Sequence, residues 1–111
     1  TFLGGMARGL LGRNCPCFIR QNRGMALSQS DLVILVGTVV DFRMGYGKVL
    51  PGPTKAKIIA VSRDPEHLEL NTGMLAQATG GWSPTLASLG DPCDFLLRLI
   101  ELSACHGRFN D

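Results

Sequence analysis

The sequence predicts an α/β fold in which a parallel β-sheet is flanked by helices. A short apolar segment runs into an Asp-Pro pair twice, in residues 57–65 and again in residues 86–92. In both copies the Asp can accept hydrogen bonds from the free N–H groups of a first helical turn. The Pro suits the first helical position, where its missing N–H costs nothing. A strand followed by a capped helix, repeated along the chain, is typical of a parallel sheet.

The clearest strand is predicted at Asp31-Leu-Val-Ile-Leu-Val-Gly37. An unbroken run of Leu, Val and Ile is what a strand buried on both faces requires, so we expect residues 32–36 to form the most buried strand. Two further strands are expected at 57–61 and 86–89. With the helices between them, this order matches the second half of a doubly wound, Rossmann-like sheet that lacks its first strand-helix-strand unit at the N-terminal side.

Helices are expected beside each strand. Residues 20–30 predict a short helix with Met25 and Ala26 available to face the sheet. A second helix is expected to begin at the Asp64-Pro65 pair. The third, from Asp91-Pro92 to about residue 104, carries most of its bulk on one apolar stripe, formed by Phe95, Leu96, Leu99, Ile100 and Leu102.

Charge is distributed unevenly along the chain. Up to Arg63 there are nine Lys or Arg and two acidic residues, whereas from Asp64 onward there are two basic and seven acidic residues. A basic half can indicate a nucleic-acid partner. Here the arginines are spaced apart, and Phe18 is the only aromatic residue among them that could stack on a base. We therefore expect no nucleic-acid partner, and the absence of an apolar window of about 18 residues predicts no membrane-spanning segment.

The four cysteines leave two interpretations open. Cys15 and Cys17 are separated by one residue, instead of the two to four found in common zinc sites, and no Cys or His pair elsewhere completes such a site. The pair is therefore either a redox or metal-binding pair, or two ordinary thiols in a reducing intracellular compartment, which the spacing favours. We expect no metal-ligating residue in this chain.

Acidic residues follow the predicted strands, at the edge where parallel α/β sheets bind ligands. Asp41, Asp64 and Asp91 can converge there. Asp64 and Asp91 are either helix N-caps alone, or one of them also contacts a nucleotide. No Gly-x-Ser-x-Gly elbow and no phosphate-binding P-loop is present, so no catalytic residue is predicted.

Several segments together resemble one enzyme family. They are Thr1 to Gly12, Ser30 to Gly37, Asp41-Phe-Arg43, Ile59 to Asp64 and Gly90-Asp91, in the family's order. The sequence resembles the central domain of thiamine-diphosphate-dependent enzymes, and within them acetolactate synthase-like proteins that act as 2-hydroxyacyl-CoA lyases. The resemblance covers residues 1–71 and 86–102.

The resemblance implies a Rossmann-like fold of the DHS-like NAD/FAD-binding type. Residues 1–104 would form part of a central domain, with a frayed tail at 105–111. In such enzymes the two outer domains bind thiamine diphosphate and Mg²⁺, and the central domain holds FAD, ADP or no nucleotide. The longer enzyme that would contain this chain is called the parent below. The chain alone is expected to be inactive, because the resemblance places the Mg²⁺ ligands and the cofactor-activating Glu in other domains. Pro92 follows Gly90-Asp91, so the family's Gly-Asp-Gly metal-binding motif is absent here.

The cofactor-binding residues implied by the resemblance lie after the strands: Gly37, Thr38, Asp41, Arg43, Asp64, Gly90 and Asp91. Two charged positions of the family's nucleotide site differ here. Val39 stands where an Arg contacts the nucleotide, and Ser62 stands where the first of two acids would be. Each lost charge-assisted hydrogen bond is worth about 1.5–3 kcal/mol, so the nucleotide site is expected to be vestigial, although Arg43 or Arg63 could substitute.

The implied partners are the remaining domains of the parent, through which it would form a homo-oligomer. Association of the parent with the endoplasmic reticulum membrane is also implied by the resemblance. An alternative from another class stays open, in which the chain is a free-standing nucleotide-binding α/β module. An Arg in place of Val39 and an acid in place of Ser62 would have favoured this alternative.

Overall fold

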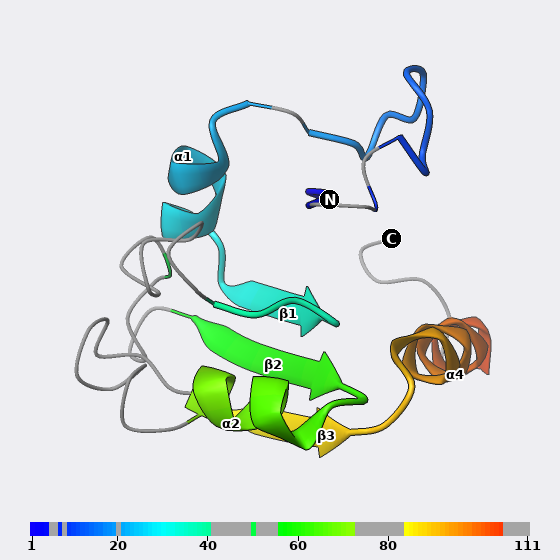
Figure 1. Cartoon of the computed structure of the whole chain (residues 1–111). Coiled ribbons are helices and arrows are strands. Elements are labelled where there is room, and N and C mark those ends of the chain that lie inside the picture. Colours follow the sequence, from blue (N-terminus) through cyan, green and yellow to red (C-terminus); the bar gives the residue numbers. More distant parts are fainter. Residues whose placement is uncertain are drawn as a thin grey trace.

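The computed structural model describes residues 1–4, 7, 9–19, 21–40, 50, 56–72 and 84–105. The sites predicted at Asp41 and Arg43 and most of the predicted tail lie outside these ranges. The elements, in chain order, are α1 Arg23–Ser28, β1 Leu32–Val36, β2 Lys57–Ser62, α2 Pro65–Thr72, β3 Leu86–Leu89 and α4 Pro92–Cys105 (Figure 1).

The three strands form one parallel sheet in the order β1-β2-β3, which confirms the predicted α/β fold class. Leu32 of β1 pairs with Lys57 of β2, and Ile59 of β2 pairs with Leu86 of β3. Backbone hydrogen bonds extend the pairing past the strand ends, since Gly37 donates to the Val61 carbonyl at 2.8 Å. The strands therefore end together at one edge of the sheet.

The core lies on one face of this sheet, between the strands and the helices α1 and α2. Leu27 of α1 and Leu68 of α2 pack there against alternate strand residues, which are Val33, Leu35, Ile58 and Ala60. Figure 1 shows α2 in front of β2 and β3. Alternation places successive side chains on opposite faces, so this core uses every second residue of β1.

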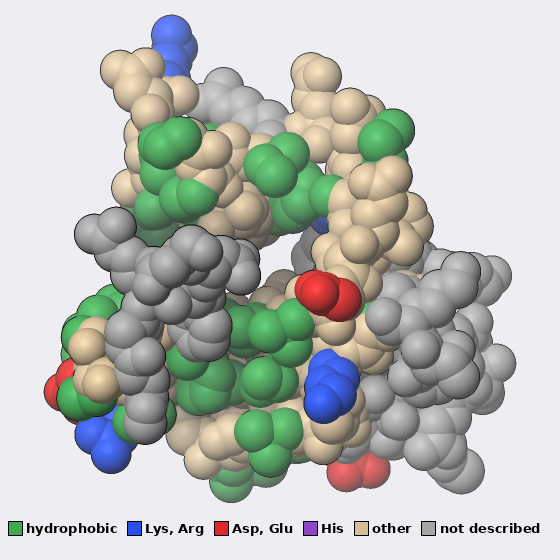
Figure 2. All heavy atoms as spheres, turned by 180° about the vertical axis from the view of Figure 1, so that it is seen from behind, with side chains coloured by type: hydrophobic (Ala, Val, Ile, Leu, Met, Phe, Trp, Pro, Cys, Tyr) green, Lys and Arg blue, Asp and Glu red, His purple; other side chains and the backbone are tan. Residues whose placement is uncertain are grey.

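The opposite face of the sheet is exposed along the first part of the strands, whereas Val61, near their carboxyl ends, is only 1% exposed. Leu32 is 48% exposed, Ile34 36% and Leu86 54%, and the pairing places Ile34, Ile59 and Leu86 in one row. We call Leu32, Ile34, Ile59 and Leu86 the open face. Figure 2 shows hydrophobic side chains gathered on the side of the sheet away from α2.

The prediction that residues 32–36 form the most buried strand is wrong. Ile58, Ala60, Val61 and Ser62 of β2 are each no more than 3% exposed, whereas β1 is buried on one face only. The physical reason is position, because β2 lies between two hydrogen-bonded neighbours and β1 has one in the described sheet.

Two helices also differ from the expectation. α1 has only six residues, and it buries Leu27 while Met25 is exposed, so the prediction that Met25 faces the sheet is wrong. In α4 no residue is buried, and Leu96, Leu99, Ile100 and Leu102 of its apolar stripe are all exposed. α4 lies beside the carboxyl ends of the strands in Figure 1. Within the described ranges, no helix is both long and apolar enough to cross a membrane.

Candidate functional site

The carboxyl ends of the three strands bring most of the predicted site residues together. Gly37 follows β1, Asp64 follows β2, and Gly90-Asp91 follow β3. A Cβ on Gly37 would lie 3.3 Å from Cγ of Pro92. The φ of Gly37 is +63°, which lies in the left-handed region. Gly suits this position because it has no Cβ and adopts positive φ without strain. The end of β1 therefore lies close to the start of α4.

Both carboxylates after the strands act as helix N-caps, which confirms that prediction. Oδ1 of Asp64 accepts a hydrogen bond from the Glu66 N–H at 2.9 Å, at the start of α2. Oδ1 of Asp91 accepts one from the Cys93 N–H at 2.7 Å, at the start of α4. Each cap satisfies a backbone donor that has no partner within its own helix.

Basic side chains lie close to both capping carboxylates. Arg63 reaches Oδ2 of Asp91 across the strand ends, with Nη2 at 3.3 Å, and so links the end of β2 to the start of α4. Nε2 of His67 lies 3.6 Å from Oδ2 of Asp64. The sequence interpretation missed the His67 contact, although the spacing of three residues within one helical turn is a signal for it. All four side chains are at least 41% exposed, so these pairs are weakly stabilising.

Ser62, which the resemblance aligns with an acid of the family, is buried. It is 3% exposed, and its Oγ accepts a hydrogen bond from the Asp64 N–H at 3.2 Å. Its carbonyl accepts another from the Gly90 N–H at 2.8 Å. Ser62 therefore stabilises the turn after β2 and is not directed to a ligand in solvent.

The polar groups of the described strand ends already have partners within the chain. The N–H groups of Gly37 and Gly90 already donate to strand carbonyls, so neither is available to a phosphate. Asp64 and Asp91 add negative charge that disfavours an anionic ligand. The described part of the chain also contains no group of three or more His, Cys, Asp or Glu that could hold a metal ion. Nucleotide contact by Gly37, Thr38, Asp64, Gly90 and Asp91 stays a prediction.

Asp91→Ala is expected to lower the free energy of unfolding by about 0.5–2 kcal/mol, because the first turn of α4 loses its cap. Asp91→Asn keeps a capping oxygen and removes the charge, and Arg63→Gln removes only the ion pair; both should cost less. Urea unfolding followed by circular dichroism measures all three. Equal losses for Asp91→Ala and Arg63→Gln would show that the ion pair, and not the cap, stabilises this end.

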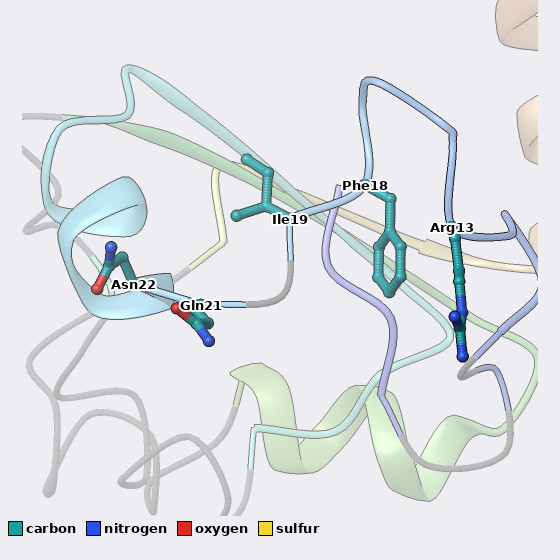
Figure 3. Close-up of a pocket in the computed structure, with 5 residues that line it drawn as sticks. All are labelled: Arg13, Phe18, Ile19, Gln21 and Asn22. Atoms are coloured by element: carbon teal, nitrogen blue, oxygen red, sulfur yellow. The ribbon is translucent and has the colours of Figure 1, made fainter.

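An open hollow of about 610 Å³ lies away from the strand ends, in the N-terminal segment. Figure 3 shows the side chains that line it: Arg13, Phe18, Ile19, Gln21 and Asn22. None of these is an acid, a His or a Cys, so the hollow offers no nucleophile or proton-transfer group from these residues. We assign it no function.

Comparison with known proteins shows similarity over nearly the whole chain. It is 54% identical over 105 residues to 2-hydroxyacyl-CoA lyase 2 of Danio rerio, covering 95% of this chain and 16% of that protein. It is 49% identical over 100 residues to 2-hydroxyacyl-CoA lyase 2 of Homo sapiens, covering 90% of this chain and 15% of that protein. The acetolactate synthase large subunit IlvG of Mycobacterium tuberculosis is 32% identical over 89 residues, covering 80% of this chain and 16% of that protein.

No family model matches the chain. No solved structure matches it either. The chain spans only about 15% of the length of the curated lyases that it matches. The similarity thus extends along most of this chain but along a small part of each relative. The chain is homologous to a segment of 2-hydroxyacyl-CoA lyase 2 and of acetolactate synthases, the thiamine-diphosphate enzymes that its motifs resemble.

Proposed function

We propose that the chain is a non-catalytic part of the central domain of a thiamine-diphosphate-dependent 2-hydroxyacyl-CoA lyase or acetolactate synthase-like enzyme. The main support is the 54% identity over 105 residues to the Danio rerio lyase. Those residues make up only 16% of that enzyme. The parent would cleave or form a C–C bond. Thiamine diphosphate supplies the carbanion and the electron sink for such chemistry when it is bound.

In the parent this chain would serve as a scaffold. The open face and the apolar stripe of α4 support this role, because parallel sheets are normally covered on both faces. We propose that the remaining segments and domains of the parent cover these surfaces, and that the parent forms a homo-oligomer through its other domains. Asp91, Arg63 and Gly37 would keep the strand ends and α4 in a fixed arrangement beneath the neighbouring domains.

We propose that other domains of the parent hold thiamine diphosphate and Mg²⁺. In this chain Pro92 follows Gly90-Asp91, so the family's Gly-Asp-Gly metal-binding motif is absent at this position. FAD or ADP would bind weakly, since the described strand ends use their N–H groups and carboxylates internally. We also propose a reducing intracellular compartment for the parent, with association to the endoplasmic reticulum membrane.

The scaffold role can be tested by replacing the matched 105 residues of the Danio rerio lyase with this chain. We expect the chimera to retain measurable lyase activity, because the exchanged segment supplies packing and not reacting groups. A matched chimera carrying Ile58→Asp should lose activity together with its folded structure. A folded chimera without any activity would count against the proposal.

The chain by itself is expected to show no saturable binding of thiamine diphosphate with Mg²⁺ and no lyase turnover. Isothermal titration calorimetry with thiamine diphosphate, ADP, FAD and CoA checks this. Micromolar binding of thiamine diphosphate would overturn the domain assignment. Micromolar binding of ADP or FAD that Asp64→Ala abolishes would instead favour the free-standing nucleotide-binding module.

A further inference from the structure

Cys15, Pro16 and Cys17 form a tight turn outside the strand-end site. The Phe18 N–H donates a hydrogen bond to the Cys15 carbonyl at 3.1 Å, which closes a four-residue turn from Cys15 to Phe18. Pro16 occupies the second position of this turn, where its fixed φ favours the bend. The turn thereby holds the two thiol-bearing residues in a defined arrangement.

The two thiols are in direct contact. Sγ of Cys15 lies 3.0 Å from Sγ of Cys17, within hydrogen-bond distance, and both thiols are free. Cys17 is exposed and Cys15 is partly exposed, so reagents in solution can reach the pair. The hydrogen bond from the Cys17 thiol holds the pKa of Cys15 below its usual range. A lower pKa raises the fraction of thiolate, which is the nucleophilic form of Cys.

We propose that Cys15 and Cys17 form a reversible intramolecular disulfide by exchange with a low-molecular-weight disulfide of the glutathione class. In the first step the Cys15 thiolate attacks one sulfur of the small disulfide, and the other sulfur leaves as a thiolate. In the second step Cys17 loses its proton to solvent and attacks Sγ of Cys15, which releases the second small thiolate. The two protein thiols are oxidised and one small disulfide is reduced to two thiols.

The location of the pair favours a reversible bond over a structural one. The bridge would close a loop with a single intervening residue, so it gains little from restricting the unfolded chain. Its exposure leaves it open to attack by thiols, as in labile and regulatory disulfides. The two other cysteines, Cys93 and Cys105, lie on α4. A metal site is less well supported, because structural zinc takes four ligands and the described residues offer no third ligand near the pair.

The test is a titration of the chain in glutathione buffers of increasing oxidised-to-reduced ratio, followed by acid quenching, alkylation and peptide mass spectrometry. We expect the peptide that contains Cys15 and Cys17 to lose both thiol hydrogens and to resist alkylation until it is reduced. The Cys93→Ser/Cys105→Ser double variant should behave in the same way. Cys17→Ser should instead accumulate a single glutathione adduct on Cys15.

Two further comparisons test the role of the turn. Pro16→Gly should lower the bridged fraction at the same glutathione ratio, because the turn is less restricted. The urea-denatured chain should likewise be less bridged than the native chain. The proposal is overturned if both cysteines carry separate adducts, if Cys15 pairs with Cys93 or Cys105, if zinc alone protects the pair from alkylation, or if denaturation leaves the bridged fraction unchanged.

Discussion

Ile58→Ala is expected to lower the free energy of unfolding by about 2–5 kcal/mol, the usual cost of removing a large buried aliphatic side chain. Ile58 lies in the central strand β2, is 1% exposed and belongs to the core with Leu35 and Ala60. The loss combines the transfer of the side chain out of the core with the cavity that remains. Because a domain is typically stable by only about 5–15 kcal/mol, this substitution removes a large share of the stability.

Ile34→Ala provides the matched control for Ile58→Ala. Ile34 lies on the neighbouring strand β1 but on the open face, and it is 36% exposed. Its truncation should cost clearly less, since part of the side chain is already in contact with water. Urea unfolding monitored by circular dichroism compares the two variants. If Ile34→Ala cost as much as Ile58→Ala, the core would not be confined to the face that α1 and α2 cover.

The chain by itself is expected to bind a hydrophobic dye such as ANS strongly under native conditions and to self-associate. The open face carries Leu32, Ile34 and Leu86, which are all exposed, and α4 adds Ile100 at 64% exposure. Large exposed apolar patches mark surfaces that other parts of a protein or other molecules cover, or surfaces that aggregate. β1 and β3 are the edge strands of the described sheet, and edge strands expose backbone groups that can pair with another chain.

Substitutions on the open face test the source of this dye binding. The Ile34→Thr/Leu86→Thr double variant should lower the ANS fluorescence, because both residues lie in one exposed row across the sheet. Leu35→Thr places the same polar residue in the core, where Leu35 is 4% exposed, and should raise the fluorescence by loosening the packing. A monomer that binds no dye and melts in a sharp cooperative transition would contradict the expectation.

The local features of this protein could be predicted from its sequence. The two Asp-Pro helix starts and the three strands follow from hydrogen bonds and apolar patterns within a few residues of one another. The alternation of these strands with helices along the chain predicts the parallel sheet. Asp64 and Asp91 cap their helices through N–H groups two residues away, so the sequence contains all the information that the cap needs. The family resemblance likewise depends on the order and spacing of motifs along the chain, and the relatives confirm it.

The tertiary structure decided which of these apolar surfaces are buried and which side chains meet. An apolar run shows that β1 can be buried on both faces, yet β1 is covered on one face, because burial depends on segments distant in the chain. The same reason leaves the stripe of α4 exposed and joins Arg63 to Asp91 across two strand ends. The contact of Cys15 with Cys17 likewise depends on the turn geometry, since the spacing alone allows the thiols to point apart.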